Sequence, residues 1–302
     1  FIRLVPASGR RDIDPQSRRT TSGSTRSRTT SMLSLGRDMS RVRAPAVAGL
    51  FYPQDAAELR RLVTTYIEAC PNAGRARQPK ALIAPHAGYL YSGAVAGCAY
   101  RVLRDSGASI RHVVLVGPSH RVPMRGLAVT SLDYFSTPLG PVPIDGPGRQ
   151  RLRELGLVGI ADAPHATEHS LEVQLPFLQT VLGEFDLLPI AAGHTPPDLV
   201  ARTLEAAWNG PETLVVVSTD LSHYHTSVEA KKLDDESTRA ILERRSDLSD
   251  EQACGARCVN GLMQIARQRS LAVELLDQRN SGDTAGDRSR VVGYGSYAVY
   301  EA

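Results

Sequence analysis

The chain has 302 residues, 42% of them hydrophobic, and a formal net charge of +3 at pH 7. A chain of this length supplies enough apolar side chains for one large α/β core, and we expect one folded domain. No apolar stretch is long enough to cross a bilayer, so we expect a soluble protein without a membrane-spanning helix.

Residues 1–44 differ in composition from the rest of the chain, because they are rich in Arg, Ser and Thr and poor in large apolar side chains. Ten arginines and three aspartates give this segment a net charge of +7, which leaves −4 for residues 45–302. The basic charge therefore does not indicate a nucleic-acid-binding body. We predict that residues 1–44 are disordered. An Arg- and Ser-rich, acid-poor N-terminus is also typical of a transit peptide, and the alternative interpretation is a gene-start error, with translation beginning at Met39.

Downstream of this segment, apolar runs alternate with amphipathic stretches, a pattern that predicts strands separated by helices. The predicted elements run, in chain order, through helix 55–70, strand 81–85, helix 93–107, strand 111–119, an antiparallel excursion at 127–145, helix 169–183, strand 185–193, helix 196–210, strand 213–220, helices 226–245 and 250–269, and strands 271–283 and 289–300. Asp55 should cap the first helix, and Pro176 should kink or break the helix that contains it. The last strand alternates in character, so we place it at the sheet edge. Together these elements predict a single-domain α/β fold, with a mostly parallel or mixed central sheet flanked by helices.

The four cysteines are Cys70, Cys98, Cys254 and Cys258. Their spacing matches neither a CxxC pair nor a disulfide framework, so we expect a reducing, cytoplasmic environment. Cys98 should be a small buried apolar side chain, and Cys70 should be chemically inert. Because Cys254 and Cys258 are four residues apart in a predicted helix, they should share one helical face.

Polar side chains follow three of the predicted strands where each strand ends. His86 follows ALIAP, His120 follows VVLVGPS, and Asp220, His223 and His225 follow VVVST. Because the carboxyl ends of parallel strands meet at one edge of a sheet, we expect most of these side chains to converge in one crevice. Imidazole and carboxylate groups bind transition metals, so the pattern indicates a metal site. A surface position explains His225 as well as a ligand role does.

A second polar cluster lies around the start of the predicted helix 169–183. It contains His165, Glu168, His169 and Glu172. His169 and Glu172 are three residues apart and can face the same cleft, so we predict that they support the metal ligands or contact the substrate. A capped, solvated helix start explains the cluster nearly as well.

The third ligand decides which chemistry such a site performs. Two histidines and one anionic group on one side of a divalent ion is the arrangement of non-haem Fe(II) oxygenases, which leaves adjacent positions open. If the Cys254 thiolate is the third ligand, the site becomes softer, and iron, copper and zinc are all admissible. The residues alone leave redox and hydrolytic chemistry open.

Eight motifs, taken in order, make the chain resemble the Memo family, also called AmmeMemoRadiSam system protein B. They are AGLFYP at 48–53, APHAGYLYSG at 84–93, VGPSH at 116–120, STPLGPVPID at 136–145, EHSLEVQLPFL at 168–178, STDLSHY at 218–224, the CG of 254–255 and GYGSYA at 293–298. The resemblance runs from about residue 43 to the end, and on it residues 45–302 are one Memo-like domain.

The resemblance implies a fold similar to the class III extradiol dioxygenases, with a metal held by His86, His120 and Cys254. The family is associated with iron and with copper-linked redox activity, so the resemblance implies Fe²⁺ first, with copper or zinc as alternatives. It also implies radical-SAM and Ammecr-type partner proteins.

The resemblance further implies that Asp220 and His223 line the pocket of the metal and that His169 and Glu172 lie near it. Cys258 stands where the family usually has proline, which either brings a second thiol close to the metal or alters the helix start.

Our leading hypothesis is a non-haem iron protein with oxidoreductase or dioxygenase-like chemistry on an unknown small molecule. Asp220 and His223 would be its acid/base groups, because a histidine beside a carboxylate suits proton transfer. The alternatives are a zinc-dependent hydrolase and a non-enzymatic module that binds a protein or peptide in the same pocket. A metal-free Cys254 nucleophile paired with His223 is less favoured, because the strand-end histidines would then lack a purpose. We expect neither a nucleic acid nor a membrane as a partner.

Overall fold

The computed structural model describes residues 41–71 and 77–301. The predicted disordered segment lies, up to residue 40, outside the described residues. Val42 and Arg43, at its predicted end, form strand β1 (Val42–Arg43). None of the described helices combines the length and apolar character needed to span a membrane.

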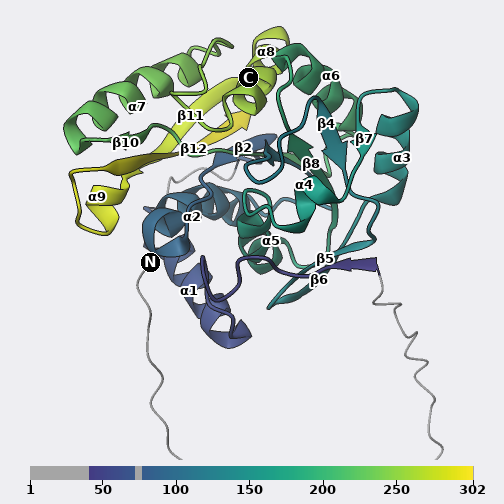
Figure 1. Ribbon diagram of the computed structural model, residues 1–302, viewed down its shortest axis with the longest axis horizontal. Coiled ribbons are helices and arrows are strands. Elements are labelled where there is room, and N and C mark those ends of the chain that lie inside the picture. Colours follow the sequence, from purple (N-terminus) through teal and green to yellow (C-terminus); the bar gives the residue numbers. More distant parts are fainter. Residues whose placement is uncertain (1–40, 72–76, 302) are drawn as a thin grey trace, which may run out of the picture. The chain divides into compact units, whose positions relative to one another are not determined.

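The centre of the fold is a mixed sheet with strand order β10-β12-β2-β9-β3-β8-β4-β7, and β11 also pairs with β12 (Figure 1). Its middle is parallel, because β2, β9, β3 and β8 run in the same direction. Antiparallel β12 and β4 flank these four strands. The strands of this sheet are β2 (Ala81–Ala84), β3 (His112–Pro118), β4 (Leu127–Val129), β7 (Gly159–Ile160), β8 (Asp186–Ala192), β9 (Thr213–Ser218), β10 (His223–His225), β11 (Ala272–Asn280) and β12 (Val291–Tyr300). The predicted mixed α/β fold is confirmed.

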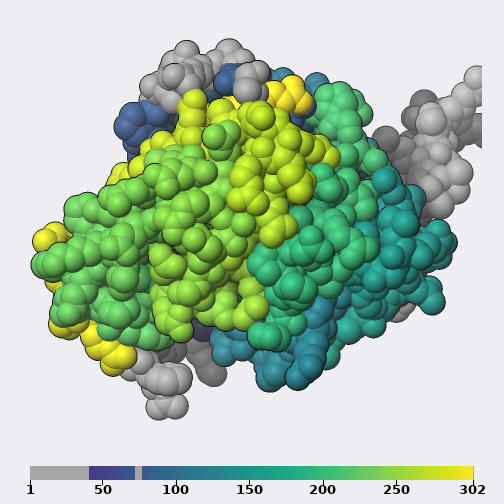
Figure 2. Space-filling view, turned by 90° about the horizontal axis from the view of Figure 1, so that it is seen from above, coloured from purple at the N-terminus to yellow at the C-terminus, as the bar shows by residue number. Residues whose placement is uncertain are grey.

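Helices cover both faces of the sheet, and each face has its own apolar core. Alternate residues of one strand serve the two cores: Val113 and Leu115 belong to one cluster, and Val114 and Val116 belong to the other. This period of two explains why the central strands are apolar throughout. One face carries α1 (Ala56–Ala69), α2 (Tyr89–Asp105) and α5 (Leu175–Leu182), and the other carries α6 (Pro197–Ala207), α7 (Ser227–Leu242) and α8 (Ala256–Gln268). Figure 2 shows the second face, covered by α7 and α8 in green to yellow-green.

Local sequence signals set several helix ends as predicted. The Asp55 side chain accepts a hydrogen bond of 2.8 Å from the Glu58 backbone N–H and so caps α1. Pro176 breaks its predicted helix, since the short 3₁₀ helix η2 (Glu172–Gln174) precedes α5 and the proline lies in the first turn of α5. The predicted helix is therefore divided into η2 and α5.

A three-stranded sheet, β1-β5-β6, lies apart from the central sheet. The predicted excursion at 127–145 is therefore divided, because β4 joins the central sheet and the hairpin of β5 and β6 pairs with β1. The elements not yet given are β5 (Tyr134–Thr137), β6 (Gly140–Pro143), α3 (Gly146–Glu154), α4 (Ala163–Ala166) and α9 (Ser281–Thr284).

Strand β12 is not at the sheet edge, contrary to our prediction, because it pairs on both sides and nearly all of it is buried. The small residues in the alternating sequence of β12 include glycines, and side chains pack closely against these glycines. A Cβ at Gly293 would lie 2.0 Å from Asp234 Oδ2, and one at Gly295 would lie 2.5 Å from the Tyr297 hydroxyl. The small residues therefore mark close packing and not exposure.

Two cysteine predictions are wrong. Cys70 and Cys98 form a disulfide between the end of α1 and the middle of α2. These helices approach closely because α2 has glycine where they meet: a Cβ at Gly97 would lie 2.5 Å from the Tyr66 carbonyl oxygen. Cys254 precedes α8, which begins at Ala256, so Cys254 and Cys258 do not share a helical face. The spacing of 28 residues between Cys70 and Cys98 has no sequence signature.

Candidate metal centre

The candidate site lies at the carboxyl edge of the parallel strands, as the sequence predicts. His86 comes two residues after β2, His120 two residues after β3, and Asp220 two residues after β9. These strands are neighbours in the order β2-β9-β3, so their ends deliver the three side chains to one place. His86 and Asp220 are buried, and His120 is partly exposed.

Three histidines gather at this edge. Ligand atoms of His86, His120 and His169 all lie within 4.8 Å of one another. Their ring centroids are 5.1 Å apart for His86 and His120, 5.4 Å for His86 and His169, and 4.9 Å for His120 and His169. His169 comes from the segment between α4 and η2, over 45 residues beyond His120 in the sequence. The sequence predicted a supporting role for it, and the structure places it among the possible ligands.

The hydrogen bonds of His86 determine which of its ring nitrogens carries a lone pair. Its Nδ1 lies 2.9 Å from Ser218 Oγ, whose own hydrogen is donated to the Ser170 carbonyl oxygen at 2.6 Å. Ser218 Oγ must therefore accept from His86 Nδ1–H, so Nε2 of the neutral ring carries a lone pair. That nitrogen is the one that points towards Cys254.

His120 is oriented by a buried carboxylate. Its Nδ1 donates to Glu168 Oε1 at 3.0 Å, and its backbone N–H donates to the other oxygen of Glu168. A carboxylate on Nδ1 fixes the tautomer with Nε2 unprotonated, which is the usual arrangement of metal-binding histidines. His169 Nδ1 lies 3.2 Å from Glu168 Oε1 but makes no hydrogen bond among the described residues, although it is buried. A buried ring nitrogen without a hydrogen-bond partner fits a metal ligand, because its lone pair can bind a cation.

Glu168 belongs to the polar cluster predicted around residues 165–172, and its role in the site does not follow from the sequence. Besides His120, it accepts from the backbone N–H groups of His169 and Ser170, both at 2.9 Å. Burial alone would raise the pKa of Glu168, but these hydrogen bonds and the neighbouring imidazoles outweigh it and lower the pKa well below its usual value. Glu168 is therefore ionised, and its negative charge favours a cation at the site. The capping pattern around it in the sequence concealed this role.

Two of the imidazoles, those of His86 and His169, are kept neutral. Burial, reinforced by the neighbouring His120 and His169 rings, lowers the pKa of His86 well below its usual value. Burial also lowers the pKa of His169 to about 4, and the carboxylate of Glu168 opposes this shift only in part. A metal ion binds the neutral form of imidazole. His86 and His169 are already in this form at neutral pH, so they release no proton when they bind a metal.

Cys254, the third ligand that the resemblance implies, adjoins this cluster on the side of His86 but does not belong to the group of ligand atoms that all lie within 4.8 Å of one another. Its Sγ lies 3.2 Å from His86 Nε2 and accepts a hydrogen bond of 3.3 Å from the Asp220 backbone N–H. Burial and the charge of Asp220 raise the pKa of the thiol well above its usual value, so the thiol is protonated at neutral pH in the metal-free protein and donates to His86. A bound cation reverses this preference, because a coordinating thiol loses its proton. Cys254 is thus near enough to share an ion with His86.

Asp220 and His223, the predicted acid/base pair, lie on the loop after β9. Asp220 accepts from the His86 backbone N–H at 2.7 Å, and its Oδ2 lies 4.0 Å from His86 Nε2. Burial raises its pKa to about 7, against the lowering effect of that hydrogen bond. His223 donates Nδ1–H to the Leu221 carbonyl oxygen at 2.8 Å, and burial lowers its pKa. The buried Asp234 holds this loop by accepting from the Ser222 backbone N–H at 3.0 Å.

One residue that we predicted to support the site, Glu172, has its carboxylate engaged by other residues. The carboxylate of Glu172 is buried against Arg43, Tyr52 and the backbone N–H groups of Ala46 and Val47.

Cys258 is buried on α8 and lines a cavity together with His120 and Cys254. Burial raises its pKa to about 12, so it is a neutral thiol. This cavity has a volume of about 320 Å³, and its wall includes Met124, Arg257 and Cys258. It gives a small molecule access to the cluster from the side of His120 and Cys254.

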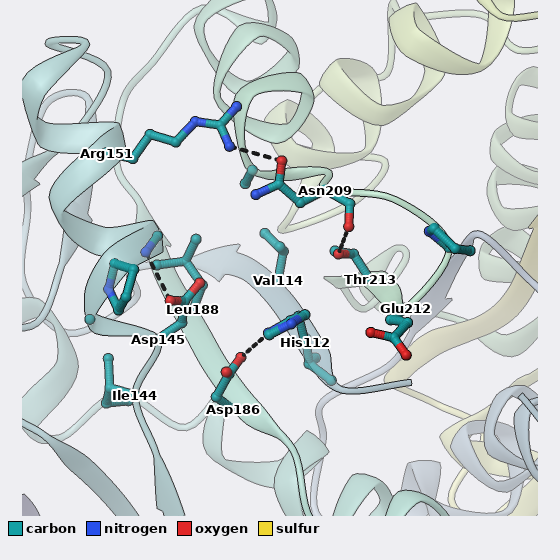
Figure 3. Close-up of a pocket in the computed structure, with 16 residues that line it drawn as sticks. His112, Val114, Ile144, Asp145, Arg151, Asp186, Leu188, Asn209, Glu212 and Thr213 are labelled. Atoms are coloured by element: carbon teal, nitrogen blue, oxygen red, sulfur yellow. Dashed lines mark hydrogen bonds and ion pairs between the residues drawn. The ribbon is translucent and has the colours of Figure 1, made fainter. Parts of the chain in front are cut away.

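A larger cavity of about 590 Å³ lies at the opposite edge of the sheet, where β3, β8 and β9 begin (Figure 3). His112 and Asp186 form a pair at 2.8 Å there, and Arg151 donates to Asn209 across the cavity. Ligands of open α/β sheets bind at the carboxyl ends of strands. Among the described residues, the histidine cluster at the carboxyl edge is therefore the better candidate site.

The fold and the site together define a mixed α/β protein with a candidate metal centre at the carboxyl edge of its sheet. A model of the family described as Memo-like protein matches residues 43–298. The MEMO1 family protein of Aquifex aeolicus is 36% identical over 272 residues, covering 84% of this chain and 97% of the relative. The MEMO1 family protein of Methanothermobacter thermautotrophicus is 34% identical over 277 residues, covering 84% of this chain and 98% of the relative. This chain belongs to the Memo-like protein family, which confirms the resemblance of its motifs.

The crystal structure of the uncharacterized protein JW3007 from Escherichia coli K12 aligns with a TM-score of 0.47 and 15% sequence identity. The alignment covers 72% of this chain and 99% of that chain.

Proposed function

We propose that this protein binds one transition-metal ion at its histidine cluster and uses it in oxidoreductase chemistry, with non-haem iron as the first candidate. The observation that carries the proposal is the convergence of His86, His120 and His169 within 4.8 Å. Hydrogen bonds donated by Nδ1 leave the Nε2 atoms of His86 and His120 unprotonated, each with a lone pair. Neutral imidazoles with their other nitrogen fixed are the donor set that a divalent transition metal requires.

The spacing of Cys254 supports its role as a further ligand. A nitrogen and a sulfur bound to one ion at about 2.1 and 2.3 Å are about 3.1 to 3.6 Å apart at tetrahedral or octahedral angles. The 3.2 Å between His86 Nε2 and Cys254 Sγ falls in this interval. We therefore propose His86, His120 and Cys254 as ligands, with His169 as the third imidazole at the same ion.

When bound, iron at such a site supplies one-electron redox chemistry and open positions for small molecules. The chain contributes the handling of protons. Asp220, with a pKa of about 7, both holds and releases a proton near neutral pH, and it lies beside His86. His223 has Nδ1 committed to the Leu221 carbonyl, so its Nε2 is the atom that accepts a proton. The cavity beside His120 and Cys254 admits the substrate.

A zinc-dependent hydrolase is the second candidate, and one observation favours it. Three histidines with ligand atoms within 4.8 Å of one another form a donor set that zinc uses in catalytic sites, where a fourth position holds water. Asp220, next to the cluster, would then be the general base. Copper fits the thiolate equally well. Metal analysis of protein purified from cells without added metal separates these candidates, because it shows directly whether iron, copper or zinc is retained.

The Cys254 thiolate is tested by the pH dependence of metal affinity. Because the thiol is protonated in the metal-free protein, its coordination must release one proton. Affinity for Co²⁺ should therefore rise with pH about tenfold more per unit in the wild type than in Cys254→Ser, between about pH 6.5 and 8.5. The pKa of His86 and that of His169 lie below this window, and Asp220 is present in both proteins. Titrations followed by visible absorption measure the two slopes.

The matched control is Cys258→Ser, which removes a buried thiol from the same cavity four residues further on. We expect its slope to equal that of the wild type. If the wild type and Cys254→Ser also share one slope, the thiol is not a ligand, and the three histidines hold the ion alone.

A further inference from the structure

Arg43 is a buried cation close to the candidate metal centre, and each nitrogen of its guanidinium group has a hydrogen-bond partner. Its Nε donates to the His165 carbonyl oxygen at 2.8 Å, its Nη2 donates to the Glu168 carbonyl oxygen at 2.6 Å, and its Nη1 pairs with the Glu172 carboxylate. The guanidinium also lies over the Phe135 ring, 5.1 Å from its centroid. Only 2% of the side chain is exposed. One side chain thus binds three points of the segment that carries Glu168 and His169.

Glu172, which pairs with Arg43, also binds the residues that follow Arg43 in the chain. Its carboxylate accepts from the backbone N–H groups of Ala46 at 2.7 Å and Val47 at 3.0 Å, and from the Tyr52 hydroxyl. It is completely buried. Residues 43–52, which we call the N-terminal strap, are therefore held along their length against the segment 165–172.

The far end of the strap reaches the candidate site itself. The ring of Phe51 lies 4.9 Å from the ring of His169, and the Phe51 carbonyl oxygen accepts from the Tyr89 backbone N–H at 2.8 Å. Phe51 touches His169 but offers no atom that binds a metal. Its contact limits where the imidazole can lie.

We propose that the N-terminal strap positions His169 and Glu168 for metal binding, with Arg43 and Phe51 as its positioning residues. The inference rests on the metal centre proposed above. Arg43 fixes the backbone at residues 165 and 168, and Glu168 in turn orients His120. Phe51 fixes the ring of His169. Lysine cannot replace the arginine, because its single ammonium group lacks the planar fork that reaches a carboxylate and two carbonyls at once.

The test uses Arg43→Lys and Phe51→Leu in the full chain, with Co²⁺ alone as the probe. Each variant should bind Co²⁺ about 10 to 100 times more weakly, as replacements of residues that orient metal ligands do. Each should also change the visible d–d absorption of bound Co²⁺, because the placement of a ligand changes. A purely structural role would lower the melting temperature and leave the spectrum of the bound ion unaltered.

The matched controls lie on the same stretch of chain. Arg41→Lys alters an exposed arginine that pairs with Asp133 at 2.9 Å, and Leu50→Ala alters a side chain that is 80% exposed beside Phe51. Both should bind Co²⁺ as the wild type does. If both positioning variants keep the affinity and the spectrum of the wild type, the inference is overturned. Phe51→Leu decides alone if Arg43→Lys does not fold, because Phe51 is only partly buried.

The two proposals fail in different ways. A wild type that binds no Co²⁺ overturns the metal centre and the role of the strap with it. A wild type that binds Co²⁺, with strap variants that bind it equally well, overturns the role of the strap alone.

Discussion

His86→Ala is expected to abolish stoichiometric metal binding, with affinity for Co²⁺ reduced at least about 100-fold, since loss of a ligand costs more than loss of a residue that orients one. The His86 ring lies 3.2 Å from Cys254 Sγ, 2.9 Å from Ser218 Oγ and 4.0 Å from Asp220 Oδ2, and it completes the three-imidazole cluster. Titration of the metal-free variant with Co²⁺, followed by visible absorption and calorimetry, measures the loss.

The control for this prediction is His225→Ala, which removes a histidine two residues beyond His223 and outside the cluster. It should bind Co²⁺ like the wild type. Far-ultraviolet circular dichroism of both variants separates a lost ligand from a lost fold. Equal affinity of His86→Ala and the wild type would exclude His86 as a ligand.

Glu168→Gln is expected to lower the affinity for Co²⁺ about 10- to 100-fold, because Glu168 holds His120 in its metal-binding tautomer. The amide is the same size but has one acceptor oxygen in place of two. Glu168 Oε1 accepts from His120 Nδ1–H and from the backbone N–H groups of His169 and Ser170, and Oε2 accepts from the backbone N–H groups of His120 and Arg121, so the donors on one of the two oxygens lose their partner. Each buried donor left unpaired costs about 1 to 3 kcal/mol of folding stability. Co²⁺ titration and thermal unfolding measure the two effects.

The control for Glu168→Gln is Glu184→Gln, at an exposed glutamate just after α5. It should change neither affinity nor melting temperature. An unchanged Co²⁺ affinity in Glu168→Gln, together with a lower melting temperature, would show that Glu168 supports the fold but not the metal centre.

The positions of the strand-end residues could be predicted from the sequence because their cause is local. Each central strand is a run of apolar residues that stops at a polar group, and parallel strands share one carboxyl edge. That reasoning places His86, His120 and Asp220 together without any knowledge of distances. It also succeeds at Pro176, where the missing backbone N–H forces a new helix start.

The rest of the site depends on contacts between distant residues, which no local pattern marks. Glu168 and His169 follow a short helix, and only the folded chain shows that they face His120. Arg43 lies 122 to 129 residues before its partners. Its surroundings in the sequence have the same composition as those of the other arginines of the N-terminal segment. Composition alone predicts a boundary at residue 44. Arg43 is nevertheless buried, because two carbonyl oxygens and one carboxylate accept hydrogen bonds from its guanidinium group.

The predicted edge position of β12 failed for a related reason. Alternation of small and large residues along a strand indicates that one face is exposed, but only if the small residues face solvent. Here Gly293 makes room for the buried Asp234 carboxylate, which holds the loop of Asp220 and His223. The GYGSYA motif thus serves the site through packing. The disulfide between Cys70 and Cys98 was missed because two helices, and not a spacing of cysteines, bring the sulfur atoms together.

The central claim is that histidines from separate strand ends and from the segment before η2 hold one metal ion. Anaerobic titration of the metal-free, full-length protein with Co²⁺ tests it most directly. We predict saturation at one ion per chain, with visible d–d bands that are absent in His120→Ala. Saturation that is never reached, or identical titration of the wild type and His120→Ala, would contradict the claim.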